Sequence, residues 1–260
     1  MKKKSAVKVV AAIQARMGST RLPGKPLMDI AGSPMIEHII KRLSASRSID
    51  MVCVATTKNP KDNKLVNYLK SRGIPYLRGS ELDIIGRLHE VVAKYNADTL
   101  VRVWGDCPLV DPFVIDDMLE KYLQEKADFA TNSEPFTYPF GMNVEVYGRS
   151  TLEDMFNKAQ DPFYKEFPVE YVKSNTRFKM VNLEYPKDAS HISLTVDYPQ
   201  DAELVSEVIK DLSEESEIPR VGEVIKYYEK NKKKFDKTSE LERNIEYKKE
   251  LETRGDAKAA

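Results

Sequence analysis

The sequence has few cysteines and no excess of charge of either sign. Its two cysteines, Cys53 and Cys107, form no CxxC pair and have no histidine cluster nearby, so disulfide and zinc-site interpretations are both weak. Lysine plus arginine and aspartate plus glutamate number 41 each, which leaves no global field to attract nucleic acid or an anionic membrane. Any anion site must be local, and we expect neither nucleic acid nor a membrane as a partner.

Long hydrophobic runs are also absent. No apolar stretch approaches the roughly 20 residues that span a bilayer. The opening MKKKSAVKVVAAI is basic and then apolar, but its apolar part is short, lacks a small-residue cleavage site and continues into a charged loop. We interpret residues 7–15 as the first buried strand of a cytoplasmic protein.

Apolar strands and amphipathic helices alternate through the first half of the chain. Strands are expected at residues 7–15, 51–55, 74–77 and 99–103, and helices at 34–44, 62–71, 82–95 and 111–125. This alternation predicts an α/β fold with a Rossmann-like, mainly parallel sheet flanked by helices.

The pattern changes near residue 127. Strands at 142–147, 178–183 and 192–196 and helices at 151–159 and 165–174 suggest a smaller antiparallel β insertion at residues 127–195, and a helix at 201–212 returns to the core. One domain is therefore expected over residues 1–225. Residues 226–260 are nearly all charged or polar, which favours a solvated helix and a frayed tail over a binding role.

The loop after the first strand combines glycines with cations. Arg16, Arg21 and Lys25 follow the strand together with Gly18 and Gly24. Ligands of open parallel sheets bind outside the carboxyl ends of the strands. Glycines let backbone N–H groups approach a ligand, and three cations can neutralise several phosphate charges. These features favour polyphosphate binding over a basic solvent-exposed loop.

Two common phosphate-binding motifs do not fit this loop. The pattern GxGxxG is absent, which excludes a dinucleotide-binding turn. A P-loop needs four residues between Gly and Gly-Lys and then Ser or Thr, whereas five residues separate Gly18 from Gly24 and Pro26 follows Lys25. The predicted phosphate site is therefore neither a P-loop nor a dinucleotide-binding turn, and a basic solvent-exposed loop stays open as the alternative.

An acidic residue follows a later strand. Asp106 comes directly after Gly105, beyond the strand expected at 99–103, so its carboxylate can reach the same edge of the sheet as the basic loop. Beside a polyphosphate it is a candidate magnesium ligand, because Mg²⁺ prefers one or two carboxylates plus phosphate oxygens. An ordinary turn is the alternative. Asp197, before Tyr198-Pro199, has a turn or capping role as its simplest interpretation.

The stretch RMGSTRLPGKPLMDIAGSPMIEHII resembles the opening of the cytidylyltransferases that activate acidic sugars. The nearest members are 3-deoxy-manno-octulosonate cytidylyltransferase and its spore coat polysaccharide biosynthesis relatives, with CMP-sialic acid synthetases further off. Residues 16–27 match the pattern R-x-x-S-x-R-L-P-G-K-P-L without a gap, and residues 105–109 match G-D-x-P-L. The segment from Val196 is similar to V-D-T-P-E-D-L, with Tyr198 and Gln200 in place of Thr and Glu.

This resemblance implies an enzyme that transfers CMP from CTP to an acidic sugar or similar anionic acceptor, releasing pyrophosphate, for surface polysaccharide or glycan biosynthesis. It implies Mg²⁺ as cofactor, with Asp106 and Asp197 as its ligands. Catalytic roles are implied for Arg16, Lys25, Asp106 and Asp197, and nucleotide binding for Arg16, Gly18, Ser19, Arg21, Lys25, Arg87 and Trp104. A sugar-1-phosphate nucleotidyltransferase using another NTP and a catalytically silent binding module are the alternatives.

Other positions resemble the family more loosely. Arg87 corresponds to an arginine near the nucleotide, and an arginine on a helix surface with no role in binding is an equal alternative. Trp104 stands where the octulosonate enzymes have a glutamine of the cytosine pocket, and Phe167 stands in place of a histidine, which favours a different acceptor. Asn143 and Glu145 in GMNVEV match a strand that would face the acceptor substrate. The family's homodimers imply that residues 127–195 serve both acceptor binding and dimerisation.

Overall fold

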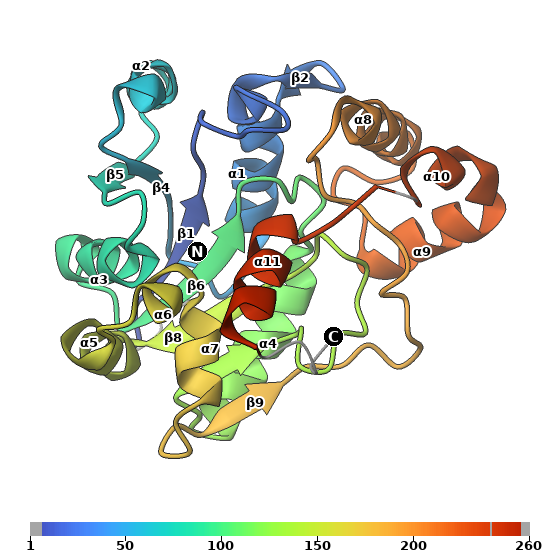
Figure 1. Ribbon diagram of the computed structural model, residues 1–260. Helices are drawn as coiled ribbons and strands as arrows, with labels where there is room; N and C mark the ends of the chain where they lie inside the picture. Colours follow the sequence, from blue (N-terminus) through green and yellow to red (C-terminus); the bar gives the residue numbers. More distant parts are fainter. Residues whose placement is uncertain (1–6, 240, 256–260) are drawn as a thin grey trace.

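A mixed seven-stranded sheet forms the centre of the molecule, in a computed structural model that describes residues 7–239 and 241–255 (Figure 1). Its strands are β1 (Val9–Gln14), β4 (Met51–Thr57), β5 (Tyr76–Gly79), β6 (Thr99–Trp104), β7 (Phe129–Thr131), β8 (Glu145–Gly148) and β9 (Met180–Asn182). Their order is β5-β4-β1-β6-β8-β7-β9. β5, β4, β1 and β6 are parallel, β8 is antiparallel to both neighbours, and β7 pairs in parallel with β9. The predicted α/β fold is confirmed.

Helices cover both faces of the sheet. The residues of β1 point alternately to these two faces and therefore pack into two different cores. Val9, Ala11 and Ile13 pack with residues of α1 (Met35–Ala45), α2 (Asn63–Ser71) and α4 (Pro112–Gln124). Val10 and Ala12 pack with residues of α3 (Ile84–Tyr95) and α5 (Arg149–Lys158). A strand buried on both faces is typical of parallel α/β sheets and explains the continuous apolar run in the sequence.

A third core lies beside the sheet. It joins α8 (Pro199–Ser213) and α9 (Val221–Lys230) to a two-stranded antiparallel sheet, β2 (Asp29–Ile30) with β3 (Ser33–Pro34). Among the described residues, no helix combines the length and the apolar character needed to cross a membrane. The small sheet directly follows the first loop and therefore attaches that loop to the third core.

Residues 127–195, expected as an antiparallel insertion, extend the main sheet through β7, β8 and β9. Only β8 is antiparallel to its neighbours, because β7 and β9 pair in parallel. The strand expected at 192–196 is wrong, since this segment forms only an isolated bridge between Phe140 and Ser193. Its apolar residues, Ile192, Leu194 and Val196, alternate because they pack into the third core. Val196 N–H also donates to the carbonyl of Asp106 at 2.9 Å, which brings two predicted motifs together.

The chain after α9 folds back against the body as α10 (Lys232–Ser239) and α11 (Ile245–Arg254), and α11 crosses the front of the molecule beside α6 (Pro162–Glu166) and α7 (Pro168–Lys173) (Figure 1). Phe235 is buried and its ring contacts that of Tyr228 at 4.9 Å. The helix expected in this segment is present as α10 and α11, but within residues 226–239 and 241–255 the segment docks on the body instead of fraying into solvent as predicted. The segment docks through a few aromatic residues and ion pairs whose partners lie far away in the sequence, and its charged composition does not indicate these contacts. Residues 256–260, which belong to the same prediction, lie outside the described part.

Candidate active site

A cavity of about 1080 Å³ opens at the carboxyl ends of β1 and β6. It is lined by the first loop, by the end of β6, by residues around 133–145 and by the C-terminal residues 232–248. Its volume suits a site for two small ligands or one large one. The cavity therefore lies where ligands of open α/β sheets bind, as predicted from the position of the first loop.

The first loop is shaped by short hydrogen-bonded turns. Gly24 adopts a left-handed conformation with φ of 79°, and its N–H donates to the carbonyl of Met17 at 3.0 Å. Ser19 Oγ accepts the N–H of Leu22 at 3.2 Å, so this hydroxyl holds the loop together. The arrangement turns the backbone sharply and directs the cationic side chains toward the cavity, which Arg16, Arg21 and Lys25 all line.

Asp62 anchors the loop to the end of β4, a role that the sequence did not reveal. Its carboxylate accepts the N–H of Met17 at 2.7 Å and both the N–H and the hydroxyl of Thr57. Its side chain is buried, at 1% exposure. A buried carboxylate is tolerated when hydrogen bonds satisfy it, so Asp62 fixes the loop at the edge of the sheet. A lone aspartate in a short 3-10 turn gives no sequence signal for this contact.

Lys25 joins the two predicted metal ligands. Its Nζ lies 2.9 Å from Asp106 Oδ2, 2.9 Å from Asp197 Oδ1 and 3.0 Å from the carbonyl oxygen of Val196. Burial alone would lower the pKa of Lys25, but the charges and hydrogen bonds of the two carboxylates outweigh it and the pKa is raised. The ammonium is therefore held charged between the motifs.

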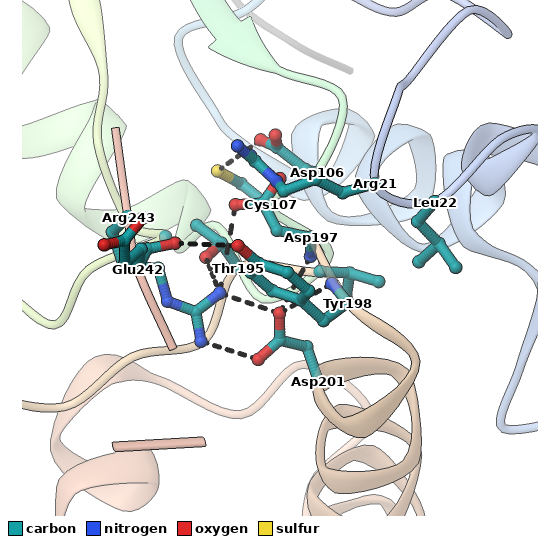
Figure 2. A network of polar contacts seen from close by, with 12 residues as sticks. Arg21, Leu22, Asp106, Cys107, Thr195, Asp197, Tyr198, Asp201, Glu242 and Arg243 are labelled. Carbon is teal, nitrogen blue, oxygen red and sulfur yellow. Dashed lines mark hydrogen bonds and ion pairs between the residues drawn. The ribbon is translucent and has the colours of Figure 1, made fainter. Parts of the chain in front are cut away.

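Arg21 also contacts Asp197. One of its Nη atoms lies 2.8 Å from Asp197 Oδ1, and the guanidinium lies 5.4 Å from the centre of the Tyr198 ring. Burial by itself would raise the pKa of Asp197, but Lys25 and Arg21 lower it. Figure 2 shows Arg21 and Asp106 near Asp197 at this point of the cavity. Two of the three predicted cations thus converge on one carboxylate.

Arg16 lies at the more open side of the cavity. Its side chain is 40% exposed and one Nη atom is 3.3 Å from Glu81 Oε1, a partner that the sequence did not indicate. Arg87, in contrast, is buried and donates to the carbonyl of Ser80 at 2.6 Å. Burial, with repulsion from Arg102 and Arg16, lowers the Arg87 pKa to about 10. Both arginines line the cavity, but only Arg16 is readily accessible.

Trp104 and Glu145 both contact Arg102, a buried arginine on β6. The Arg102 guanidinium lies 4.5 Å from the centre of the Trp104 ring, and its Nη1 is 2.8 Å from Glu145 Oε2. Glu145 also accepts the hydroxyl of Tyr147 at 2.6 Å. The Glu145 carboxylate is therefore already paired within the protein. The sequence did not single out Arg102 as its partner, because only the β6–β8 pairing brings the two residues opposite each other. Asn143, another cavity residue, accepts the N–H of Gly141 at 3.0 Å.

Cys107 is no candidate nucleophile. Its side chain is buried, and burial together with the neighbouring Asp106 carboxylate raises the thiol pKa well above its ordinary value. Because the thiolate is the nucleophilic form, this cysteine is inert at neutral pH. The chemistry of the site is thus confined to cations, carboxylates and polar groups.

The oxygens around Lys25 Nζ also suit a hard cation. Two carboxylates and a backbone carbonyl converge there, and Mg²⁺ prefers such oxygen donors together with phosphate oxygens. Within residues 7–239 and 241–255, no group of three or more His, Cys, Asp or Glu residues forms a metal site by itself. Asp106 and Asp197 therefore fit Mg²⁺ best when a bound phosphate supplies further oxygens.

Comparison with known proteins decides the class of the protein. Residues 10–258 match the model of the cytidylyltransferase family. The chain belongs to the cytidylyltransferase family. It is therefore a CTP-dependent nucleotidyltransferase, and the resemblance to the acidic-sugar cytidylyltransferases is confirmed.

The chain is similar to a spore coat polysaccharide biosynthesis protein and to 3-deoxy-manno-octulosonate cytidylyltransferases. The spore coat polysaccharide biosynthesis protein SpsF of Bacillus subtilis is 27% identical over 218 residues, which are 81% of this chain and 90% of SpsF. The 3-deoxy-manno-octulosonate cytidylyltransferase of Escherichia coli is 32% identical over 169 residues, 64% of this chain and 66% of that enzyme. The solved structure of a cytidylyltransferase from Leptospira borgpetersenii superposes with a TM-score of 0.82 at 34% identity, covering 88% of this chain and 96% of the other.

Proposed function

We propose that the protein transfers CMP from CTP to an acidic sugar, with release of pyrophosphate, in the biosynthesis of a surface polysaccharide or related glycan. The observation that carries this proposal is the convergence of Lys25, Asp106 and Asp197 at a cavity lined by the cationic first loop. The acceptor class is drawn from the octulosonate and spore coat relatives. Cytoplasmic location, where CTP is supplied, belongs to the same proposal.

The first loop would hold the triphosphate. Arg16, Arg21 and Lys25 supply three cationic donors to the cavity lining, which also includes Ser19, whereas Gly18 belongs to the same loop but not to the lining. Charge-assisted hydrogen bonds of this kind stabilise the developing charge on a leaving pyrophosphate. Because Arg21 and Lys25 pair with Asp197, arrival of the triphosphate would give these cations a new anionic partner.

Asp106 and Asp197 would hold Mg²⁺. When bound, the ion would neutralise charge on the α-phosphate and lower the pKa of the acceptor hydroxyl. The protein's part is to keep the two carboxylates together, which Lys25 does through 2.9 Å contacts with both. Little covalent chemistry is needed, since phosphoryl-type transfer depends mainly on alignment and charge neutralisation.

The remaining walls would receive the base and the acceptor. Trp104 would offer a ring face to the base, with the guanidinium of Arg102 packed against the ring, and Arg87 also lines the cavity. Asn143, Glu145 and Phe167 line the part of the cavity assigned to the acceptor. Homodimerisation through residues 127–195 stays a prediction, which sedimentation measurements can check.

Nucleotide-dependent thermal stabilisation tests the donor half of the proposal. The unfolding temperature is measured with CTP, UTP, GTP and ATP, each with and without Mg²⁺. We expect stabilisation by CTP that Mg²⁺ enhances and that the other nucleotides do not match. Preference for another nucleotide would favour a sugar-1-phosphate nucleotidyltransferase, and no response to any nucleotide would favour a silent binding module.

A further inference from the structure

The C-terminal segment, residues 241–255, docks on the Asp197 motif through one arginine. Arg243 Nη1 donates to Asp201 Oδ2 at 2.7 Å and Nη2 donates to Asp201 Oδ1 at 2.6 Å, a fork-to-carboxylate pair (Figure 2). The side chains are 14% and 2% exposed, respectively. Arg243 Nη1 also lies 3.3 Å from Thr195 Oγ1 and 3.8 Å from Asp197 Oδ2. The guanidinium is therefore part of the polar network around Asp197.

Asp201 links Arg243 to the backbone of Asp197. Its Oδ2 accepts the N–H groups of Asp197 and Tyr198, both at 2.9 Å, from the first turn of α8. A buried carboxylate with four donors has one defined orientation, whereas one that has lost its guanidinium is left under-compensated and must move or recruit water. The position of the Asp197 backbone consequently depends on a residue 46 positions later in the chain.

The same segment forms a wall of the cavity. Its cavity-lining residues are Leu241, Arg243, Asn244, Ile245, Tyr247 and Lys248. The Tyr247 ring packs on Phe167 with centroids 5.1 Å apart, and its hydroxyl donates to Glu170 Oε1 at 2.9 Å. The segment thus spans from the Asp197 motif to α7, on the acceptor side of the cavity.

Two of the positions at which this sequence departs from the family pattern, Tyr198 and Phe167, are positions that the segment touches. Tyr198, in place of threonine, lies 5.9 Å from the Arg243 guanidinium and donates its hydroxyl to the carbonyl of Glu242 at 3.4 Å. Phe167, in place of histidine, carries the contact with Tyr247. Both positions carry aromatic rings that the segment contacts.

We propose that Arg243 is a positioning residue of the transfer site, which through Asp201 fixes Asp197 for Mg²⁺-dependent nucleotide binding. The inference rests on the proposed function, which assigns Mg²⁺ to Asp106 and Asp197. An arginine suits the role because its planar fork satisfies both carboxylate oxygens at once, which a lysine cannot do. The C-terminal segment accordingly contributes to the site by positioning Asp197.

CTP affinity, measured by calorimetry with the full-length chain in the presence and absence of Mg²⁺, tests the proposal. For Arg243→Ala we expect the affinity in Mg²⁺ to fall about 10–100-fold, as is typical when a group that orients a metal ligand is lost. The metal-free affinity should fall much less, because Arg243 reaches the loop cations only through Asp197, whereas Mg²⁺ needs Asp197 itself as a ligand. Arg243→Lys should give an intermediate loss, and it provides the measurement if the alanine variant does not fold.

Arg254→Ala is the matched control. Arg254 lies in the same segment and pairs with Asp161 at 2.6 and 3.2 Å, and neither residue lines the cavity, so this variant should keep the wild-type affinities. The loss caused by Arg243→Ala should also largely disappear in an Asp201→Asn background, because the two residues act as a unit. An unchanged Mg²⁺ effect in Arg243→Ala, or equal losses with and without Mg²⁺, would overturn the inference and leave the proposed function standing. Absence of CTP binding by the wild-type protein would overturn both.

Discussion

Lys25 Nζ lies 2.9 Å from Asp197 Oδ1, although the two residues are 172 positions apart in the sequence. The same ammonium lies 2.9 Å from Asp106 Oδ2. Three motifs that are separate in the sequence therefore meet at one charged group. This convergence places the first loop, to which we assign phosphate binding, beside the carboxylates that we assign to Mg²⁺.

Asp106→Asn should abolish turnover while the fold persists. The substitution removes one of two carboxylates from the proposed Mg²⁺ site, and we expect kcat to fall by at least about 10²-fold, the order seen when one group that stabilises the transition state is removed. The side chain is 25% exposed and its ion pair with Lys25 has a second anion, Asp197, to compensate. Steady-state kinetics with far-UV circular dichroism checks this; full activity in the folded variant would reject the metal assignment.

Gly24→Ala should weaken CTP binding through backbone strain in the first loop. Gly24 has φ of +79°, and an added Cβ would meet only Met17 Cε at an ordinary 3.6 Å, so the cost comes from the dihedral angle. A non-glycine residue in this conformation costs about 1–2 kcal/mol. Gly32→Ala is the control, because Gly32 has φ of +85° with open space around it and lies beyond the first loop, in the turn between β2 and β3. Urea unfolding should show similar losses for both variants, but CTP titration should show weaker binding only for Gly24→Ala; equal binding by the two variants contradicts the role of the loop.

Glu145→Ala should destabilise the fold by about 3–5 kcal/mol, because it leaves the buried Arg102 guanidinium without its ion-pair partner. Arg102 and Glu145 side chains are only 5% and 3% exposed. Asn143→Ala removes one hydrogen bond to the Gly141 N–H and should cost about 1 kcal/mol. Urea unfolding of both variants checks the difference. If Glu145→Ala keeps wild-type stability, the carboxylate is available for the acceptor instead.

Trp104→Ala should lower CTP affinity about tenfold, since stacking of a base on an aromatic ring contributes about 1–3 kcal/mol. Trp104→Phe should retain most of the affinity because it keeps a ring face. Calorimetric titration of both variants with CTP checks this prediction. Equal affinity of the alanine variant and the wild-type protein would mean that the base binds elsewhere in the cavity.

Local sequence patterns were sufficient for the parallel part of the fold. The apolar run before Arg16 and the helical periodicity after Pro34 each depend only on which residues of one strand or helix face the core. The segment at 192–196 was assigned incorrectly because alternating apolar residues pack equally well on a helix as in a sheet, and only the tertiary structure distinguishes the two.

Long-range polar partners could not be predicted in the same way. Arg243 stands in a charged stretch in which each neighbouring residue is equally plausible as a solvated side chain, and only docking selects Asp201 as its partner. Asp62 and Arg102 are similar cases, because a hydrogen-bond partner 45 or 43 positions away is set by strand order and not by spacing along the chain. The motifs therefore identified the charged centre of the site but not the residues that hold it in place.

Transfer itself provides the most direct test. The wild-type protein is incubated with CTP, Mg²⁺ and 3-deoxy-manno-octulosonate, or a nine-carbon acidic sugar, while pyrophosphate and the CMP-linked product are quantified by enzymatic assay and mass spectrometry. We predict equal amounts of pyrophosphate and CMP-sugar with at least one of these acceptors, and neither product with Asp106→Asn. Binding of CTP without pyrophosphate release for any acidic sugar would contradict the proposed transfer.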